Sequence, residues 1–219
     1  MAEQTDSRLS GRRVVLAGAT STAGLAVARA LHGAGAHVIA TGRSADRLQE
    51  LADAGAEVVV ADATSLAEMA ALASRSGAVD AVIPLVGGWR GGGGLAGQSD
   101  EDFAALLPAL ESVRATSRAF DAALRASEAG RFAIVSSTAV ARPLAGGANY
   151  ASVKAASEAW ARAVAQGYAK AAREAGVPLR TASVVLRAKA LDPEALATRI
   201  LSLWDADAAD LNDRVFDLE

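Results

Sequence analysis

The chain has 219 residues, no cysteine and a formal net charge of −3. This length suits one domain with a substantial core, so we predict a single domain over residues 1–219. The lack of cysteine excludes disulfides and thiolate chemistry. The slightly acidic balance, with no basic run, argues against a nucleic-acid binder. Apolar runs stay below the roughly 18–20 residues of a membrane span. The polar residues 1–13 have no signal-peptide core, so we expect a cytoplasmic protein without membrane contact.

Short valine-rich runs alternate with longer alanine-rich stretches along the chain. In chain order, this pattern predicts strand 13–17, helix 22–33, strand 37–41, helix 44–54, strand 57–61, helix 65–74, strand 79–86, helices 100–107 and 109–128, strand 132–136, helix 149–175, strand 179–186, helix 193–204 and strand 214–218. Pro108 predicts a break or kink between two helical stretches. Continuous apolar strands alternating with helices are typical of the α/β class, with a doubly wound parallel sheet of about seven strands and helices on both faces. We expect ligands at the carboxyl ends of the strands.

Tyr150 and Lys154 stand four residues apart in the predicted helix 149–175. Residues with this spacing share one helix face, so the phenol and the ammonium are expected to point into the same space. A neighbouring cation lowers the pKa of a tyrosine from its reference of about 10. Tyr150 is therefore a candidate proton donor or acceptor. Ser137 lies thirteen residues upstream, just after the predicted strand 132–136.

A short glycine turn joins the first predicted strand to the first predicted helix. Gly18 can adopt the tight turn, and Gly24 allows helix and strand to pack closely. The N-terminus of the helix then offers free N–H groups to a pyrophosphate. An ordinary strand-to-helix turn is the alternative interpretation. The residues of this turn predicted to contact a cofactor are Gly18, Thr20, Ser21, Thr22, Ala23 and Gly24.

The end of the second predicted strand bears on the choice of nucleotide. The sequence there has no acidic residue to hold the ribose hydroxyls of NAD, but it has Arg43 and Ser44. A guanidinium can form a forked contact with a phosphate, and the serine can add a hydrogen bond. The pattern favours NADP(H) over NAD(H). The alternative is that Arg43 is simply a solvated side chain in a turn.

With these features the sequence resembles the short-chain dehydrogenase/reductase family, over nearly its whole length. The family commonly has Thr-Gly-x-x-x-Gly-x-Gly at the glycine turn. The four defined positions are Ala17, Gly18, Thr22 and Gly24 here, so Thr22 replaces the middle glycine. The resemblance implies a Rossmann-type fold, a nicotinamide cofactor and an oxidoreductase that acts on a small molecule.

The resemblance also implies roles for individual residues. Tyr150 would exchange the proton at the substrate oxygen, and Ser137 would orient the carbonyl. Lys154 would bind the nicotinamide ribose and lower the pKa of the tyrosine. Asp62 matches the aspartate that contacts adenine in the family. Ala63 and Gly87 complete the expected set of cofactor contacts.

The sequence departs from the family pattern in three places. Residues 84–87 read Pro-Leu-Val-Gly where the family usually has Asn-Asn-Ala-Gly. Leu110 aligns best with an asparagine that helps a water relay to the lysine. After the predicted strand 179–186 there is no Pro-Gly, and a helix follows almost at once, so the substrate lid is very short. Proton relay and nicotinamide orientation are therefore expected to differ in detail.

The segment Gly88, Trp89 and Arg90 follows the fourth predicted strand within a stretch of seven glycines. A similar Gly-Gly-Trp occurs in the dihydropteridine reductase branch of the family. A planar indole there can stack on a flat substrate, so these residues are candidate substrate contacts. Arg90 would meet an anionic substrate or be solvated. The alternative is a mobile loop with one anchoring tryptophan.

The leading hypothesis is an NADPH-dependent carbonyl reductase. A non-redox enzyme on the same scaffold, such as an isomerase or dehydratase, is a second hypothesis because fold does not determine chemistry. An NADP-binding protein without turnover is a third. In the family, the helices corresponding to 109–128 and 149–175 build a two-fold interface, so a dimer or tetramer is expected. We expect no metal site.

Overall fold

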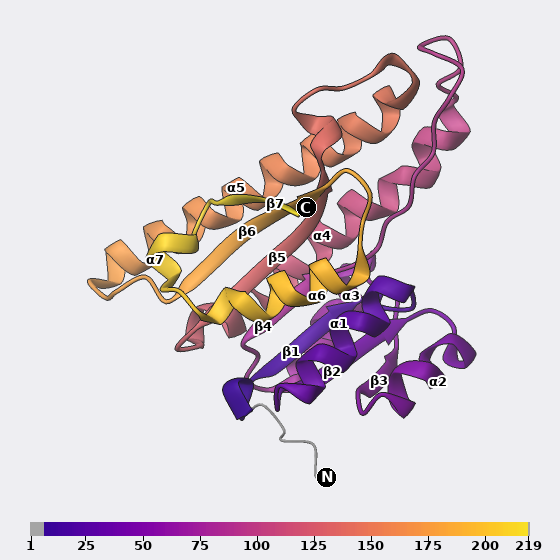
Figure 1. The fold of residues 1–219 in the computed structure, drawn as a ribbon. Coiled ribbons are helices and arrows are strands. Elements are labelled where there is room, and N and C mark those ends of the chain that lie inside the picture. The colour runs from indigo at the N-terminus through magenta and orange to yellow at the C-terminus, as the bar shows by residue number, and fades with distance from the viewer. Residues whose placement is uncertain (1–6, 219) are drawn as a thin grey trace.

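A computed structural model of the protein describes residues 7–218. In this part of the chain seven parallel strands form one sheet, in the order β3-β2-β1-β4-β5-β6-β7 (Figure 1). The strands are β1 (Arg13–Ala17), β2 (His37–Gly42), β3 (Glu57–Val60), β4 (Ala81–Pro84), β5 (Gly130–Ser137), β6 (Thr181–Ala188) and β7 (Val215–Leu218). The strand order reverses between β1 and β4, which makes their carboxyl ends the switch point. The predicted α/β, doubly wound parallel sheet is confirmed.

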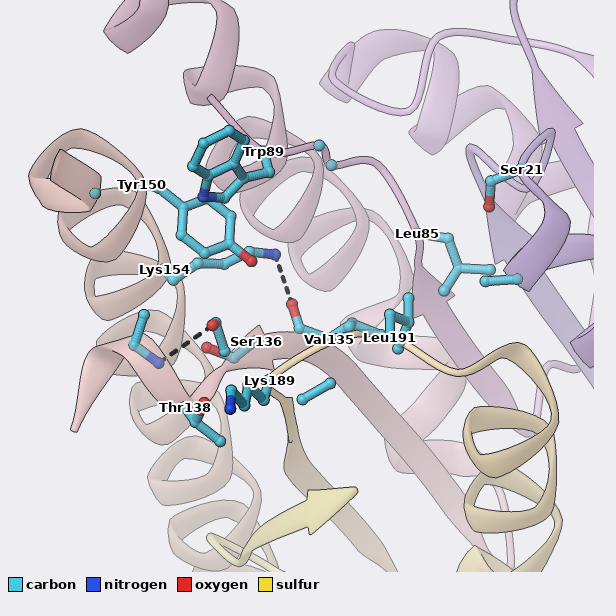
Figure 2. Close-up of a pocket in the computed structure, with 18 of the residues that line it drawn as sticks. Ser21, Leu85, Trp89, Val135, Ser136, Thr138, Tyr150, Lys154, Lys189 and Leu191 are labelled. Atoms are coloured by element: carbon cyan, nitrogen blue, oxygen red, sulfur yellow. Dashed lines mark hydrogen bonds between the residues drawn. The ribbon is translucent and has the colours of Figure 1, made fainter. Parts of the chain in front are cut away.

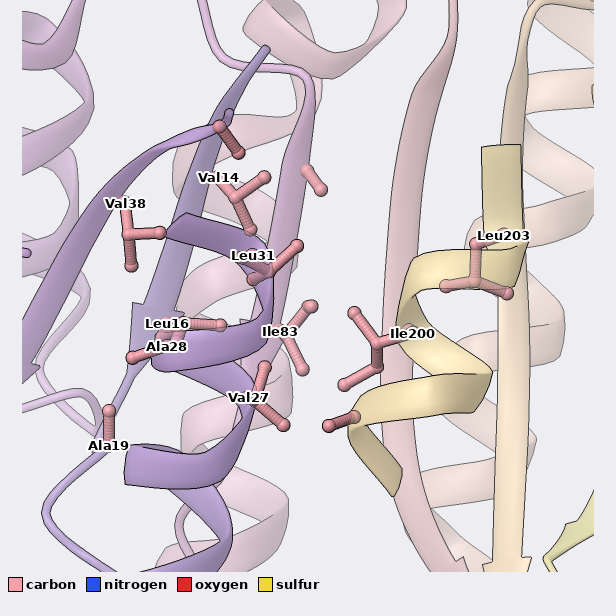
Figure 3. Packing of buried hydrophobic residues seen from close by; sticks show 14 of the residues in the cluster. Val14, Leu16, Ala19, Val27, Ala28, Leu31, Val38, Ile83, Ile200 and Leu203 are labelled. Carbon is pink, nitrogen blue, oxygen red and sulfur yellow. The ribbon is translucent and has the colours of Figure 1, made fainter. Parts of the chain in front are cut away.

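Helices cover both faces of this sheet. They are α1 (Thr22–Gly33), α2 (Ala45–Asp53), α3 (Leu66–Ser76), α4 (Asp100–Ala126), α5 (Ala148–Ala175), α6 (Pro193–Leu201) and α7 (Ala208–Leu211). One buried apolar cluster joins the sheet to α1, α2 and α6 (Figure 3). A second cluster joins the opposite face to α3, α4 and α5.

The strand β1 shows how the sequence builds both layers. Its side chains alternate between the two faces, so Val14 and Leu16 belong to the first cluster and Val15 and Ala17 to the second. All four are fully buried. This explains why the strands read as continuous apolar runs rather than as alternating ones.

Polar caps fix where several helices begin. Ser21, Ser44, Ser65 and Ser99 each accept a hydrogen bond from a backbone N–H in the first turn of α1, α2, α3 and α4, respectively. Such caps satisfy backbone donors that have no partner inside the helix. Three of these helices start at the carboxyl edge after β1, β2 and β3, so the caps help to place the loops that surround the site.

The predicted break at Pro108 is wrong in its simplest form, because α4 runs without interruption over Asp100–Ala126. Proline cannot donate to the carbonyl of Ala104, four residues earlier. Ala104 is exposed, so water can satisfy that carbonyl, and the lost bond is tolerated within a long helix.

No helix in residues 7–218 combines the length and the apolar character needed to cross a membrane. The predicted polar segment 1–13 lies partly outside the described residues, as do the ends of the predicted domain 1–219.

Candidate active site

A cavity of about 1220 Å³ opens at the carboxyl ends of the central strands. It exceeds the roughly 300–1,000 Å³ of common small-molecule pockets, so it has room for a ligand larger than a typical drug. It brings together nine of the predicted site residues: Ser21, Thr22, Ala23, Gly87, Gly88, Trp89, Ser137, Tyr150 and Lys154. The predicted residues that do not line it are Gly18, Thr20, Gly24, Arg43, Ser44, Asp62, Ala63 and Arg90.

The glycine turn leaves no room for larger residues. Gly18 has a φ of 75°, a conformation that favours glycine, and a Cβ there would overlap the side chain of Val86. A Cβ on Gly24 would overlap the backbone of Ala19. Both glycines therefore let the turn between β1 and α1 fold back tightly, as the sequence predicts, although neither lines the cavity itself.

The start of α1 presents backbone donors to the cavity. Ser21 accepts the N–H of Gly24 at 3.1 Å. The N–H groups of Thr22 and Ala23 belong to the first turn, where no acceptor exists within the helix, and both residues line the cavity. An anion is favoured at such a terminus. The side chain of Thr22, at the position of the missing glycine, is exposed at the same place.

Tyr150 and Lys154 lie in the first two turns of α5 and face the cavity together (Figure 2). The ammonium nitrogen of Lys154 stands 5.8 Å from the centre of the Tyr150 ring. The same nitrogen donates a hydrogen bond to the carbonyl of Val135 in β5 at 2.8 Å. The two side chains thus point into the same space, as their spacing predicts, and the hydrogen bond to β5 fixes the position of the lysine.

Burial changes the acidity of Lys154, whose side chain is almost inaccessible to water. Burial lowers the pKa of Lys154 to about 8, while the nearby carboxylate of Glu158 acts in the opposite direction. A lysine with a depressed pKa in a cleft is typical of a functional site.

A buried network of charges lies behind the lysine. Glu158, one turn further along α5, accepts hydrogen bonds from Ser136 at 2.7 Å and from Arg187 at 2.8 and 2.6 Å. Burial pushes the pKa of Glu158 upward, but the hydrogen bonds from Arg187 and Ser136 outweigh it, so the net pKa is lowered. The carboxylate therefore stays ionised behind Lys154 and ties α5 to β5 and β6.

Ser137 ends β5 and lines the cavity. Its hydroxyl oxygen accepts the backbone N–H of Ala139 at 3.2 Å. Because that contact uses an oxygen lone pair, the O–H remains able to donate a hydrogen bond. The neighbouring Ser136 also lines the cavity but already donates its O–H to Glu158, so Ser137 is the serine of this pair whose O–H is free to donate to a ligand.

The candidate nucleotide-selecting residues follow β2, outside the cavity. Arg43 is exposed, and the Ser44 oxygen caps α2 through the N–H of Arg47 at 3.4 Å. The guanidinium of Arg47 reaches back to the carbonyl of Thr20 in the glycine turn at 2.8 Å. Arg47 therefore places a cation at the glycine turn, which the sequence did not predict.

Asp62 follows β3 on the same edge of the sheet. One of its oxygens accepts the N–H and the hydroxyl of Thr64, at 2.9 and 2.8 Å. These bonds, chiefly the backbone one, keep the pKa of Asp62 below its usual value, and Arg43 contributes. Ala63 is buried. Asp62 thus shapes its own turn, and its other oxygen has no hydrogen bond within residues 7–218.

Trp89 projects from the glycine-rich segment into the mouth of the cavity, with 65% of its surface exposed. Gln98, at the end of this segment, donates to the carbonyls of Gly92 and Gly146 at 3.0 and 3.1 Å. Its amide oxygen accepts the N–H of Asn149 at 3.1 Å. Since α5 has no side-chain cap of its own, Gln98 caps it from a distant part of the chain, next to Tyr150.

The three departures from the family pattern all lie at or beside the cavity. Leu85 lines it, and Leu110 and Tyr150 pack against the same small apolar cluster. Only residues 189–192 separate β6 from α6, and Lys189 and Leu191 line the cavity. The predicted short lid is therefore a four-residue loop at the edge of the site.

Sequence reasoning missed several residues of the site. Arg142 and Leu144 line the cavity from the segment before α5, and Lys189 lines it from the loop after β6. No local motif distinguishes them, because their importance depends on which loops meet at the sheet edge. The sequence gives only a weak indication of Arg47, because it is a second arginine four residues after Arg43, at the start of a helix.

The family model described as "short chain dehydrogenase" matches residues 12–175. The chain therefore belongs to the short-chain dehydrogenase family, and it is an NAD(P)-dependent oxidoreductase of that type. Members of this family bind small-molecule substrates and typically form oligomers. The comparison with curated proteins found no match.

Solved structures share the fold at low sequence identity. A short chain dehydrogenase from Salmonella enterica serovar Typhi is 19% identical, with a TM-score of 0.84, covering 99% of this chain and 98% of that one. A candidate short chain dehydrogenase from Shigella flexneri, complexed with NADP, is 19% identical, with a TM-score of 0.84 and coverage of 98% and 99%. An oxidoreductase from E. coli is 18% identical, with a TM-score of 0.82 and complete coverage of both chains.

Proposed function

We propose that this protein is an NADPH-dependent reductase of a ketone, an aldehyde or a related planar substrate. The observation that carries the proposal is the arrangement of Ser137, Tyr150 and Lys154 in one cavity that also reaches the start of α1. A proton donor, a hydrogen-bond donor and a buried cation together suit chemistry at a carbonyl oxygen.

The residues present fit a dinucleotide. Gly18 and Gly24 allow the turn that brings the N–H groups of Thr22 and Ala23 to the cavity. Arg43 and Ser44 would meet the 2′-phosphate, and Asp62 with Ala63 would meet the adenine. Gly87 and Lys154 would hold the nicotinamide half, since a Cβ on Gly87 would lie 3.8 Å from the lysine nitrogen. The neighbour complexed with NADP supports this assignment. NADPH supplies the hydride when it is bound.

The side chains of this protein handle the proton. Tyr150 donates a proton from its hydroxyl to the substrate oxygen, and Ser137 donates a hydrogen bond to the same oxygen. Lys154, held by Val135, keeps a positive charge beside the phenol. Leu110 has no group that can bind water. After Tyr150 has given up its proton, a new proton therefore reaches it from solvent at the mouth of the cavity or through Lys154.

Gly88 and Trp89 form the substrate side of the proposed site, where the indole can lie against a flat molecule. The resemblance to the dihydropteridine reductase branch rests on this segment. Arg90 is exposed and does not line the cavity, so we propose no direct contact between Arg90 and the reacting group.

The decisive variant is Tyr150→Phe. We expect it to lower the rate of NADPH oxidation by about 100-fold or more, the contribution of a general acid, against a panel of aldehydes, ketones and quinonoid compounds. The affinity for NADPH, measured by fluorescence titration, should change by less than about twofold because the phenyl ring remains. Undiminished turnover in Tyr150→Phe would refute the proposed acid.

A non-redox enzyme on the same scaffold is the second candidate, favoured by Leu110 and by the four-residue loop after β6. It predicts that NADPH binds but is not oxidised with any compound of the panel. The third candidate is a protein that binds NADP and catalyses no reaction at all.

We also propose that the protein forms a dimer or tetramer through residues 109–128 and 149–175. The outer face of α5 supports this, because Ala155, Ala159, Ala163 and Gly167 are exposed and small. Small residues let two helices approach closely, and two-fold interfaces are common. A cytoplasmic location remains a prediction from the sequence.

A further inference from the structure

The cavity carries charge of one sign. Among its lining residues, Arg142, Lys154 and Lys189 are cationic, and none is aspartate or glutamate. A cleft with apolar walls and one sign of charge concentrates ligands of the opposite charge. Lys154 has its place beside Tyr150 in the proposed reaction, which leaves Arg142 and Lys189 to be explained.

Both remaining cations lack a protein partner. Neither the guanidinium of Arg142 nor the ammonium of Lys189 forms an ion pair or hydrogen bond within residues 7–218. Asp192, three residues after Lys189, already caps α6 through Ala195 at 2.7 Å, and Glu158 is bound by Arg187 and Ser136. Arg142 and Lys189 are therefore free to meet an anion.

Their place in the fold separates them from the phosphates of the proposed cofactor. Arg142 lies between β5 and α5, and Lys189 follows β6. Ser21 follows β1 and Arg43 follows β2, on the other side of β4 in the sheet order. In Figure 2, Ser21 stands across the view from Lys189, with Tyr150 on the same side as Lys189.

Large apolar side chains line the same cavity as these cations. Leu144, Trp89 and Leu191 line the cavity with 71%, 65% and 41% of their surfaces exposed. Exposed apolar groups gathered at a cavity mouth indicate a surface that a ligand covers. The body of that ligand is thus apolar, and the indole suits a flat one.

We propose that the substrate is a flat, largely apolar carbonyl compound that carries an anionic group, a carboxylate or a phosphate, bound by Arg142 and Lys189. This inference rests on the proposed reductase function and specifies its substrate class. It moves the anion contact from Arg90, which the sequence offered, to two residues on other loops.

The test compares binding of 2-naphthoate and its neutral methyl ester to the NADP⁺-loaded protein by titration calorimetry. We expect the carboxylate to bind about tenfold more tightly or better, the effect of one or two hydrogen bonds to a charged group. The double variant Arg142→Gln and Lys189→Gln should equalise the two affinities. The matched control, Arg75→Gln with Lys170→Gln, removes the same charges from the opposite end of the sheet and should keep the preference.

Equal binding of the two compounds by the natural protein, no binding of either, or a preference that survives in the double variant would overturn the anion site. A second experiment measures NADPH oxidation with 6-formyl-2-naphthoate and with its methyl ester. A binding preference without NADPH oxidation in the presence of either aldehyde would leave the anion site standing and refute the reductase. NADPH oxidation with both aldehydes, combined with equal binding of 2-naphthoate and its methyl ester, would refute the anion site and leave the reductase standing.

Discussion

Lys154 carries its charge where water hardly reaches. Burial lowers its pKa to about 8 from an ordinary value of 10.5, so between these values the unfolded chain binds more protons than the folded one. By linkage, folding stability attributable to this group rises with pH across that window. Below about pH 8 the buried ammonium is fully charged, so it lowers the folding stability by its full amount.

This predicts a pH signature for Lys154→Met. As pH rises from about 8 to 10.5, the natural protein should gain up to about 3 kcal/mol relative to the variant, because each pKa unit corresponds to about 1.4 kcal/mol. Urea unfolding at several pH values measures the difference. Stability curves that run parallel in the two proteins would show that the lysine is not desolvated.

Arg43 is the residue that we propose selects NADPH over NADH. We expect Arg43→Ala to weaken NADPH binding by about tenfold or more, the loss of a charge-assisted hydrogen bond to phosphate, and to change NADH binding by less than about twofold. Arg47→Ala is the comparison, because Arg47 holds the carbonyl of Thr20 and should affect both nucleotides alike. Equal losses for NADPH and NADH in Arg43→Ala would remove it from the 2′-phosphate site.

At the scale of elements, the glycine-rich segment and the start of α5 act as one unit. The side chain of Gln98 forms hydrogen bonds with the backbone of Gly92, Gly146 and Asn149. Tyr150 directly follows Asn149 in the chain. Backbone that is joined through one side chain loosens when that side chain is removed. Gln98 is a positioning residue, since it does not line the cavity.

Gln98→Ala should therefore lower both stability and turnover. Loss of hydrogen bonds to partly buried backbone groups costs about 1–3 kcal/mol, and hydrogen exchange should rise in residues 87–98 and 142–149. Gln49→Ala, an exposed glutamine in α2, serves as the control. Unchanged exchange in the two segments would show that Gln98 does not hold them together.

Pro108 shows what local rules miss at this scale. Proline removes one hydrogen bond, but α4 has 27 residues and packs against α3 and α5. Tertiary packing supplies most of the stability of a helix in a protein. The local rule therefore predicted a break where the packed helix continues.

At the scale of the whole molecule, we propose that the outer face of α5 forms the interface between subunits. We expect light scattering to give a mass of two or four chains, and Ala163→Arg to shift it toward one chain because a long charged side chain would stand where helices meet. Ala71→Arg, on the exposed side of α3, should leave the mass unchanged. A monomer at every concentration of the natural protein would refute the interface.

The features readable from the sequence are those written in short stretches. Tyr150 and Lys154 share a helix face because of their spacing, and Gly18 and Gly24 mark a turn that admits no Cβ. The alternation of apolar runs with helices was enough for the α/β class and the parallel sheet. Each of these depends on local geometry alone.

Only the tertiary structure decided which distant loops meet at the cavity. It brought Arg142 and Lys189 to one mouth without any carboxylate, and it placed Gln98 at the start of α5. Such contacts join residues dozens of positions apart, and no local spacing records them. The proposed reaction therefore rests on a few local motifs, whereas the proposed charge of the substrate and the support of the tyrosine follow from how the sheet arranges its loops.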